Sequence, residues 1–241
     1  MSQAPARVGG HVDIDVYSDV DCPWCYIGKR RLEAALERYD GDVKITYRPF
    51  QLDPSTPTEG RPLSEWLNPK FGGPARVRQM TAHTASVAAS DGITMDFDSA
   101  IIANTFNAHR LIWFAGRHGR NAEVAEALHK AHFTDGLDIG SLSVLTDAAV
   151  SAGLDAETVR AFLESAEGTD EVTAEINEAH QLGISSVPTF VFAGKYAVSG
   201  AQDPDLLLQT LQEVARRESA TSVLQPIGPD GQVCDDDSCA V

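Results

Sequence analysis

Two hydrophobic patterns alternate along the chain, and each predicts a different element. Apolar residues alternate with polar ones over 12–17, which predicts a short strand with one buried face. The next apolar positions fall seven, four and three residues apart and so share one face of a helix: Cys25, Leu32, Leu36 and Tyr39. Residues 43–48 predict a second strand, so the chain opens with a strand–helix–strand unit.

The middle of the chain carries helical spacing instead. Residues from about 63 to 163 predict a series of helices separated by glycines: 75–90, 100–118, 122–133, 141–151 and 156–164. From residue 172 an amphipathic helix leads to an apolar strand at 189–192, a hairpin turn and a last helix that begins at Asp203-Pro204. The pattern therefore predicts an α/β protein whose two α/β segments flank a long helical stretch.

Composition and charge exclude several classes of partner. The chain has 241 residues, of which 43% are hydrophobic and 22% charged, as expected of a globular protein. Its 19 basic and 35 acidic residues give a net charge of −16, which argues against binding to nucleic acid or an anionic membrane. No apolar run has membrane-spanning length, and residues 1–10 carry no apolar signal segment. We expect a cytoplasmic protein, whose oligomeric state the sequence leaves open.

The four cysteines occur as two close pairs, Cys22/Cys25 and Cys234/Cys239. In the cytoplasm such pairs are more often catalytic or metal-bound than structural. Cys22 and Cys25 stand three residues apart where the first helix begins, so their thiols become neighbours on its first turn. Unpaired amides and the helix dipole favour a thiolate at that end. We interpret Cys22 as an accessible nucleophile and Cys25, on the buried helical face, as the resolving thiol.

The two residues between these thiols suit a redox site. Pro23 has no amide hydrogen and holds a helical φ angle, which fits the first turn of a helix. Trp24 places an apolar surface beside the sulfur, either as a platform for an extended peptide or as ordinary packing. A structural zinc site is the alternative for a Cys-x-x-Cys pair, but zinc knuckles lie in tight turns and this pair opens an amphipathic helix.

Three further side chains are candidates for the chemistry. Asp15 and Asp19 precede the thiols, and each is a candidate acceptor for the proton of Cys25. The alternatives are a solvated strand edge for Asp15 and a capping role for Asp19. His109 falls on an apolar helical face, where a histidine is more often a buried structural residue than a catalyst.

Val187-Pro188 stands immediately before the apolar strand at 189–192. A proline is tolerated in a central strand only at its end. A cis bond would turn the backbone of Val187 outward and offer its amide and carbonyl to an extended peptide. A trans proline at the strand start is the commoner arrangement, because only about 5–6% of such bonds in folded proteins are cis.

In combination these motifs resemble the DsbA-like thioredoxin-fold family. Residues 18–30, Ser-Asp-Val-Asp-Cys-Pro-Trp-Cys-Tyr-Ile-Gly-Lys-Arg, and residues 104–111, Asn-Thr-Phe-Asn-Ala-His-Arg-Leu, are similar to its cytoplasmic FrnE-type branch. The match covers roughly residues 11–218. It implies a thioredoxin-like fold with a long all-helical insertion: a thioredoxin-like domain at 11–55 and 166–219, the insertion at 56–165 and a tail at 220–241.

The resemblance also implies thiol–disulfide oxidoreductase or isomerase chemistry, with a cis Pro188 beside the cysteines and a substrate groove between the core and the insertion. We then expect Pro23, Trp24, Val187, Pro188 and His109 to contact substrate. The expected partners are disulfides and thiols of proteins or peptides, with glutathione or a thioredoxin system as the second redox partner. This chemistry requires no metal and no organic cofactor.

Two other functions stay open. The related hydroxychromene-carboxylate isomerases use glutathione and have a serine at the position of Cys22, so a glutathione-dependent isomerase or transferase is the less favoured interpretation. A zinc-binding protein would join all four cysteines of the chain in one metal site.

The segment after Thr221 loses hydrophobic periodicity and gains proline and glycine, which predicts a flexible extension. It ends in a second candidate redox pair, Cys234 and Cys239, with three aspartates between the thiols that disfavour their ionisation. We predict that this pair exchanges with Cys22 and Cys25. The alternative is a solvated acidic tail whose cysteines are incidental or bind metal.

Overall fold

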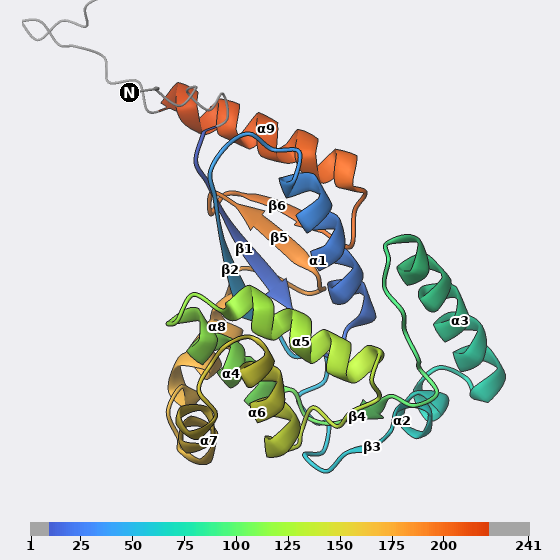
Figure 1. The fold of residues 1–241 in the computed structure, drawn as a ribbon. Coiled ribbons are helices and arrows are strands. Elements are labelled where there is room, and N and C mark those ends of the chain that lie inside the picture. Colours follow the sequence, from blue (N-terminus) through green and yellow to red (C-terminus); the bar gives the residue numbers. More distant parts are fainter. Residues whose placement is uncertain (1–9, 222–241) are drawn as a thin grey trace, which may run out of the picture.

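The computed structural model describes residues 10–221, so the predicted tail pair lies outside the described residues. Within this range a mixed four-stranded sheet has the strand order β2-β1-β5-β6 (Figure 1). Its strands are β1 (Val12–Ser18), β2 (Val43–Pro49), β5 (Thr189–Phe192) and β6 (Tyr196–Ser199). β1 runs parallel to β2 and antiparallel to β5, so strands from the first and the last part of the described range pair side by side.

The alternation of side chains along β1 gives the sheet two covered faces. Ile14 and Val16 are buried with Phe190 and Phe192, their partners on β5, against α1 (Pro23–Leu36) and α9 (Pro204–Thr221). Tyr17 points to the opposite face, where it packs with Phe50 and with Ala179 of α8 (Thr169–Gln181). Since both faces are covered, the strands combine alternating and continuous apolar stretches.

The segment between β2 and α8 is helical, with one short exception. Its helices are α2 (Leu63–Lys70), α3 (Pro74–Ser90), α4 (Phe106–Gly116), α5 (Asn121–Phe133), α6 (Leu142–Ser151) and α7 (Ala156–Glu164). The exception is a two-stranded ribbon of β3 (Arg61–Pro62) and β4 (Ile101–Ile102). The predicted helix over 100–118 is therefore wrong at its start. There, the Leu63 amide bonds the Ala100 carbonyl, and two consecutive isoleucines suit extended backbone.

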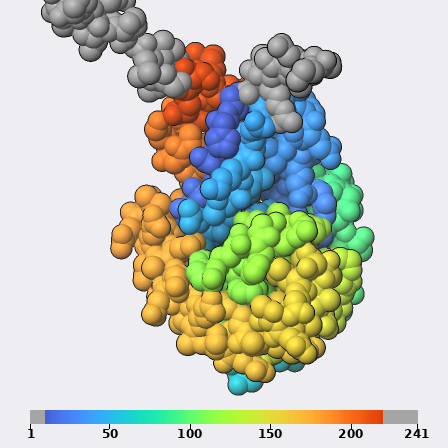
Figure 2. Space-filling model, turned by 60° about the vertical axis from the view of Figure 1, so that its left-hand side comes forward, coloured from blue at the N-terminus to red at the C-terminus, as the bar shows by residue number. Residues whose placement is uncertain are grey.

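The helical segment shares its core with the sheet. One cluster of buried residues runs from Ile14 and Phe190 of the sheet to Leu128 of α5, Leu145 of α6 and Phe162 of α7. In the space-filling view, the blue N-terminal unit rests directly on the green and yellow helices (Figure 2). α3 lies to one side (Figure 1), where its Ala88 packs with Tyr26 and Ile27 of α1 in a separate buried cluster. None of the helices in the described range is both long and apolar enough to cross a membrane.

Candidate active site

Helix α1 begins at the first cysteine of the pair. Cys22 is the N-cap, with an extended backbone (φ −92°, ψ 111°), and Pro23 is the first helical residue. The Cys22 carbonyl accepts from the amides of Cys25 and Tyr26 at 3.0 and 3.4 Å. Proline fits here because its missing amide hydrogen is one that the helix start leaves unpaired. The turn therefore places both thiols at the same end of α1.

The two thiols are free and close together, and both are buried. Cys25 is 2% exposed, which confirms its predicted place on the buried face. Cys22 is only 4% exposed, so the expectation of an accessible first thiol is wrong for this structure. The loop before β5 covers it, because the Cys22 thiol lies 3.7 Å from the carbonyl oxygen of Val187. Trp24, at 37% exposure, is the part of the motif that reaches the surface.

The Val187-Pro188 bond is cis, as the family resemblance implies. Pro188 is buried and Val187 half-buried. The Pro188 carbonyl accepts from the Gly200 amide at 2.7 Å, which ties the loop to the end of β6. The loop before β5 is therefore fixed at a defined position beside Cys22.

Helix α1 approaches this loop so closely that only glycine fits at the contact. A Cβ atom on Gly28 would stand 2.8 Å from Pro188 Cγ and 3.2 Å from Phe190 Cζ. Distances this short require the proline ring to move, so the absence of a side chain at Gly28 sets the separation between α1 and the loop. The sequence shows a glycine inside the predicted helix, at the end of the Cys-Pro-Trp-Cys-Tyr-Ile-Gly run, but its contact with Pro188 depends on the fold.

Burial, followed by a hydrogen bond with Cys22 and the charge on Cys22, raises the pKa of the Cys25 thiol well above its usual range. The Ser18 hydroxyl and the backbone of Asp19 oppose the rise without cancelling it. Cys25 therefore holds its proton while Cys22 carries negative charge, as a resolving thiol should.

Asp19 is a fully hydrogen-bonded carboxylate. Its Oδ1 accepts from the Val20 amide at 2.9 Å and lies 3.0 Å from His109 Nε2, and its Oδ2 accepts from the Leu52 amide at 2.6 Å. Burial alone would raise the pKa of Asp19, but the hydrogen bond and charge of His109 and the Leu52 amide lower it. A carboxylate stabilised in this way is a poor proton acceptor, so the structure corrects the candidate role predicted for Asp19.

Asp15 and His109 are also engaged elsewhere. Asp15 accepts from Arg48 Nε at 2.8 Å on the face of the sheet that α8 covers, and it is not among the strongest influences on Cys25. His109 is buried in α4 against Asp19, which contradicts its predicted contact with substrate. The alternative interpretation of His109 as a buried structural histidine fits its position.

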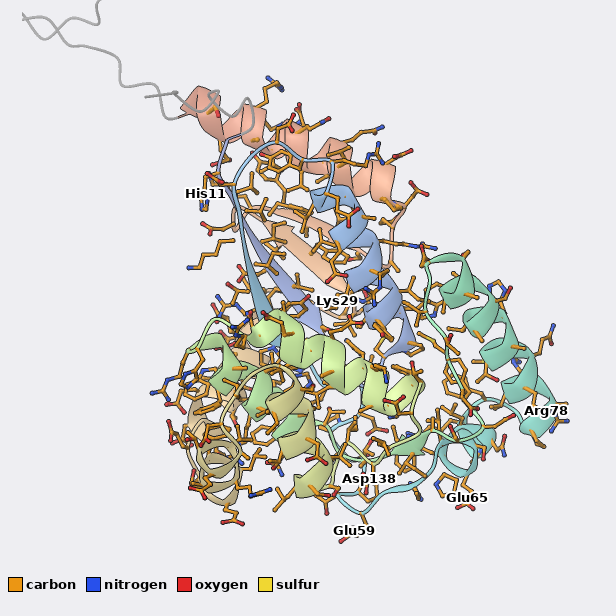
Figure 3. All side chains as sticks on the ribbon, viewed as in Figure 1. His11, Lys29, Glu59, Glu65, Arg78 and Asp138 are labelled. Atoms are coloured by element: carbon orange, nitrogen blue, oxygen red, sulfur yellow. The ribbon has the colours of Figure 1, made fainter. Side chains whose placement is uncertain are left out.

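A partly buried charge cluster, which the sequence did not predict, joins α1 to α5. Lys29 on α1 (labelled in Figure 3) is almost fully buried. It donates to Glu126 on α5 at 2.7 Å. Glu126 also accepts from the Tyr26 hydroxyl at 2.9 Å and from Arg30. Burial acts to raise the pKa of Glu126, but the hydrogen bond and charge of Lys29 lower it. Lys29 stands four residues after Cys25 and three before Leu32, on the buried face of α1, and only the fold shows which acidic side chain pairs with it there.

Asp21, immediately before the first thiol, is the other residue that the sequence analysis passed over. Its Oδ1 is buried and has no hydrogen-bond partner. Among the described residues, no group of three or more histidine, cysteine or acidic side chains is arranged to hold a metal ion. The alternative zinc site, made by all four cysteines of the chain, needs Cys234 and Cys239, which lie outside the described range.

Two known proteins are similar to most of this chain. A probable DsbA oxidoreductase from Streptomyces coelicolor is 34% identical, with 96% of this chain and 99% of that chain covered and a TM-score of 0.80. The uncharacterised protein YwbO of Bacillus subtilis is 25% identical over 209 residues, which are 86% of this chain and 99% of that protein.

A more distant structure shares the fold alone. The cytosolic disulfide reductase DsbM from Pseudomonas aeruginosa, solved with glutathione, is 16% identical, with coverage of 87% and 98% and a TM-score of 0.57. The family model of the DSBA-like thioredoxin domain matches residues 13–212, which include both cysteines, the helical segment and the loop before β5. This chain therefore belongs to the DSBA-like thioredoxin domain family.

Proposed function

We propose that the Cys22–Cys25 pair is the active site of a thiol–disulfide oxidoreductase. Membership of the DSBA-like family supports this class of chemistry. The observation that carries the assignment is the position of the Cys22 sulfur, 3.7 Å from the Val187 carbonyl, with the protonated Cys25 thiol on the same turn of α1.

The reaction exchanges one disulfide for another. The Cys22 thiolate attacks one sulfur of a substrate disulfide, whose S–S bond breaks as a bond from Cys22 forms, and the released thiolate takes a proton from water. Cys25 then loses its proton to water and attacks the Cys22 sulfur, which releases the second substrate thiolate. Two electrons pass from the dithiol to the substrate, and the reverse sequence oxidises a substrate dithiol.

We propose that the substrate is an extended peptide held beside the backbone of Val187. A strand added at a loop edge gains affinity from main-chain hydrogen bonds, with little demand on side-chain sequence. Trp24 is the exposed apolar surface next to the sulfur, and it supplies contact area for the peptide. Pro23, at the start of α1, and Pro188, in the loop before β5, flank the proposed peptide site on its two sides.

We place the reaction in the cytoplasm, with glutathione or a thioredoxin system as the second redox partner. The distant cytosolic disulfide reductase DsbM, solved with glutathione, supports this choice. The acidic balance of the chain, −16 in net charge, gives no reason to expect a membrane surface or nucleic acid as partner.

Cysteine variants test the assignment. Cys22→Ser is expected to abolish disulfide exchange with a scrambled or insulin-like substrate, whereas Cys25→Ser is expected to accumulate a mixed disulfide at Cys22 that mass spectrometry detects. Both substitutions are nearly isosteric and remove one buried thiol each, so each is the stability control for the other. Turnover by Cys25→Ser without any trapped adduct would contradict the assigned roles.

We also propose that Cys234 and Cys239 form a second redox pair that exchanges with the first. Its support is the sequence alone, because both residues lie outside the described range. The test is the glutathione titration of the full chain against a chain that ends at Ala220. An altered midpoint or a Cys22-to-tail disulfide in Cys25→Ser supports the exchange, and identical midpoints and turnover contradict it.

A further inference from the structure

Asp21 occupies the turn between β1 and α1, next to the first thiol. The Cys22 amide donates to the Asp19 carbonyl at 3.2 Å, and this bond closes the turn that contains Asp21. Asp19 directs its two carboxylate oxygens to three partners, the amides of Val20 and Leu52 and the His109 ring. Asp21 contrasts with it, because Asp21 Oδ1 is buried and accepts no hydrogen bond. A buried oxygen without a donor disfavours the ionised carboxylate.

The groups around Asp21 supply negative rather than positive charge. In its own turn the neighbours are Asp19 and the Cys22 sulfur, which act on it most strongly after burial. From α4, His109 is committed to Asp19. From α5, His129 and His132 face this region, and burial lowers their pKa values to about 3 and about 4, so both are neutral at pH 7.

The buried cation of α1 is engaged elsewhere. Lys29, on the same helix as Cys22, is bound to Glu33 and Glu126. Burial, the charge of Asp19, a hydrogen bond with Asp19 and the charge of Cys22 together raise the pKa of Asp21 well above its usual range. A carboxyl group in this setting keeps its proton as long as a thiolate stands beside it.

We propose that Asp21 is a positioning residue that opposes negative charge on the Cys22 sulfur and binds a proton when that sulfur becomes a thiolate. The effect favours the disulfide form of the Cys22–Cys25 pair, because the thiolate in the reduced form is the state that Asp21 penalises. This inference rests on the proposed function and adds a determinant of its redox equilibrium.

The proton balance makes the role measurable. When two glutathione thiols reduce the Cys22–Cys25 disulfide, they lose two protons and two electrons and form glutathione disulfide. One proton goes to Cys25, the other to Asp21, and the Cys22 thiolate carries the charge that Asp21 gave up. Reduction then releases no proton to solvent. In Asp21→Asn the second proton is released to solvent, and reduction becomes more favourable as pH rises.

The experiment is a glutathione redox titration of the full chain between pH 5.5 and 8, followed by thiol labelling and mass spectrometry of the Cys22–Cys25 peptide. Asp21→Asn is expected to shift the equilibrium toward the dithiol by at least about tenfold at pH 7.5, the change that one pKa unit of interaction gives. The shift should shrink toward pH 5.5. Asp13→Asn, which neutralises an exposed carboxylate on β1, is the matched control and should follow the parent protein.

A second measurement uses the unaltered protein and does not depend on the folding of a variant. Proton exchange with a weakly buffered solution is recorded as the Cys22–Cys25 disulfide is reduced at pH 7.5. Retention of the second glutathione proton beyond Cys25, together with the appearance of the ultraviolet absorbance of a Cys22 thiolate, supports the role of Asp21. A protonated Cys22 thiol would retain that proton without the absorbance. Superimposable titrations of the parent and Asp21→Asn at every pH, or release of the second proton by the parent, would overturn it.

The two hypotheses fail in different ways. If glutathione does not change the redox state of Cys22 in the parent at any ratio, the proposed oxidoreductase function fails. If the parent titrates normally and Asp21→Asn matches it, only the role of Asp21 fails.

Discussion

Helix α1 contacts two of its neighbours by different chemistry. On one side Gly28 lies against Pro188 and Phe190 in an apolar contact that has no space for a methyl group. On the other side Tyr26, Lys29 and Arg30 bind Glu126 of α5 through charge and hydrogen bonds. The first contact sets the distance between Cys22 and the loop before β5, and the second holds the helical segment to the sheet.

This difference indicates that the Gly28 contact controls disulfide exchange at Cys22, whereas the Glu126 contact controls how the helical segment is joined to α1. Close apolar packing has a steep repulsive wall, so a displacement of a few tenths of an ångström at Gly28 moves the loop that faces the thiol. Hydrogen-bonded charges tolerate small displacements, but they respond to pH and to the loss of one partner. The two sides of α1 should therefore fail in different ways when they are altered.

The largest effect is expected for Gly28→Ala. The added methyl group would meet Pro188 Cγ at 2.8 Å, and overpacking of this kind costs about 3 kcal/mol at the upper end of its usual range. We expect a lower free energy of unfolding in urea and slower disulfide exchange, because the loop moves away from Cys22. Gly116→Ala, with its nearest neighbour atom at 3.9 Å, is the control and should be neutral or stabilising. Unchanged exchange in Gly28→Ala would show that the contact does not set the site.

Glu126→Gln tests the charged side of α1. The substitution keeps the shape and the contact with Tyr26 but leaves Lys29 with Glu33 as its remaining partner. We expect a loss of about 2 kcal/mol in the free energy of unfolding, the usual value of a hydrogen bond to a charged group. Disulfide exchange per folded molecule should stay unchanged. Glu123→Gln removes an exposed pair with Arg120 on the same helix and should cost less than about 0.5 kcal/mol.

The α5 side of this contact should also make stability depend on pH. Burial, followed by the charge of Lys29, lowers the pKa of His129 to about 3, whereas a histidine in the unfolded chain titrates near 6.5. Between these two pKa values the unfolded chain binds a proton that the folded chain does not. The contribution of His129 to the free energy of unfolding is therefore fully present above pH 6.5 and is lost as the pH falls. The slope for one histidine is at most about 1.4 kcal/mol per pH unit.

Urea unfolding of the parent and His129→Gln from pH 7 to 4.5 measures this slope. The free energy of unfolding of the variant should decline less steeply on acidification. Asp21 acts in the opposite direction, because its raised pKa lowers stability as pH rises, and this effect cancels when the curve of the variant is subtracted from that of the parent. His11→Gln, at the exposed far end of β1, should decline in parallel with the parent (Figure 3). Equal slopes for the parent and His129→Gln would exclude a neutral buried His129.

The smallest effect is expected at the C-terminal end of α1. Arg38 pairs there with Asp205 of α9, and both side chains are more than half exposed. Arg38→Gln should lower the free energy of unfolding by no more than about 0.5 kcal/mol in low salt and by less in 1 M salt. Both Arg38→Gln and Glu126→Gln remove one partner of an ion pair near α1. Because only the Glu126 pair includes a buried side chain, the difference between the two losses measures the effect of burial. A loss at Arg38 as large as that at Glu126 would contradict this separation.

Local patterns were sufficient to predict the elements that carry the site. The spacing from Cys25 to Tyr39 predicted α1, and Pro23 marked its start because proline suits that position. Hydrophobic periodicity also placed most helices of the insertion within a few residues. It failed at residues 100–105, where the hydrogen bond to a residue of the distant segment at 61–63 decides the conformation.

The electrostatics of the site could not be read from spacing. Asp15, Asp19 and Asp21 lie close together along the chain and look alike in the sequence. Their partners differ because the fold brings Arg48 to the first, His109 and Leu52 to the second, and no donor to Oδ1 of the third. Lys29 is buried for the same kind of reason, since its partner is 97 positions away in α5. Such long-range contacts decide which carboxyl group holds a proton.

The separation of Cys22 and Val187 in the chain also affects how the protein is made. The two residues are 165 positions apart, and ribosomes add about 5–20 residues per second, so Val187 is translated roughly 8–33 s after Cys22. Over that interval a nascent chain presents Cys22 and Cys25 without strand β5 and the loop that covers the first thiol. Protection of Cys22 from other thiols therefore begins only when translation has nearly completed the sheet.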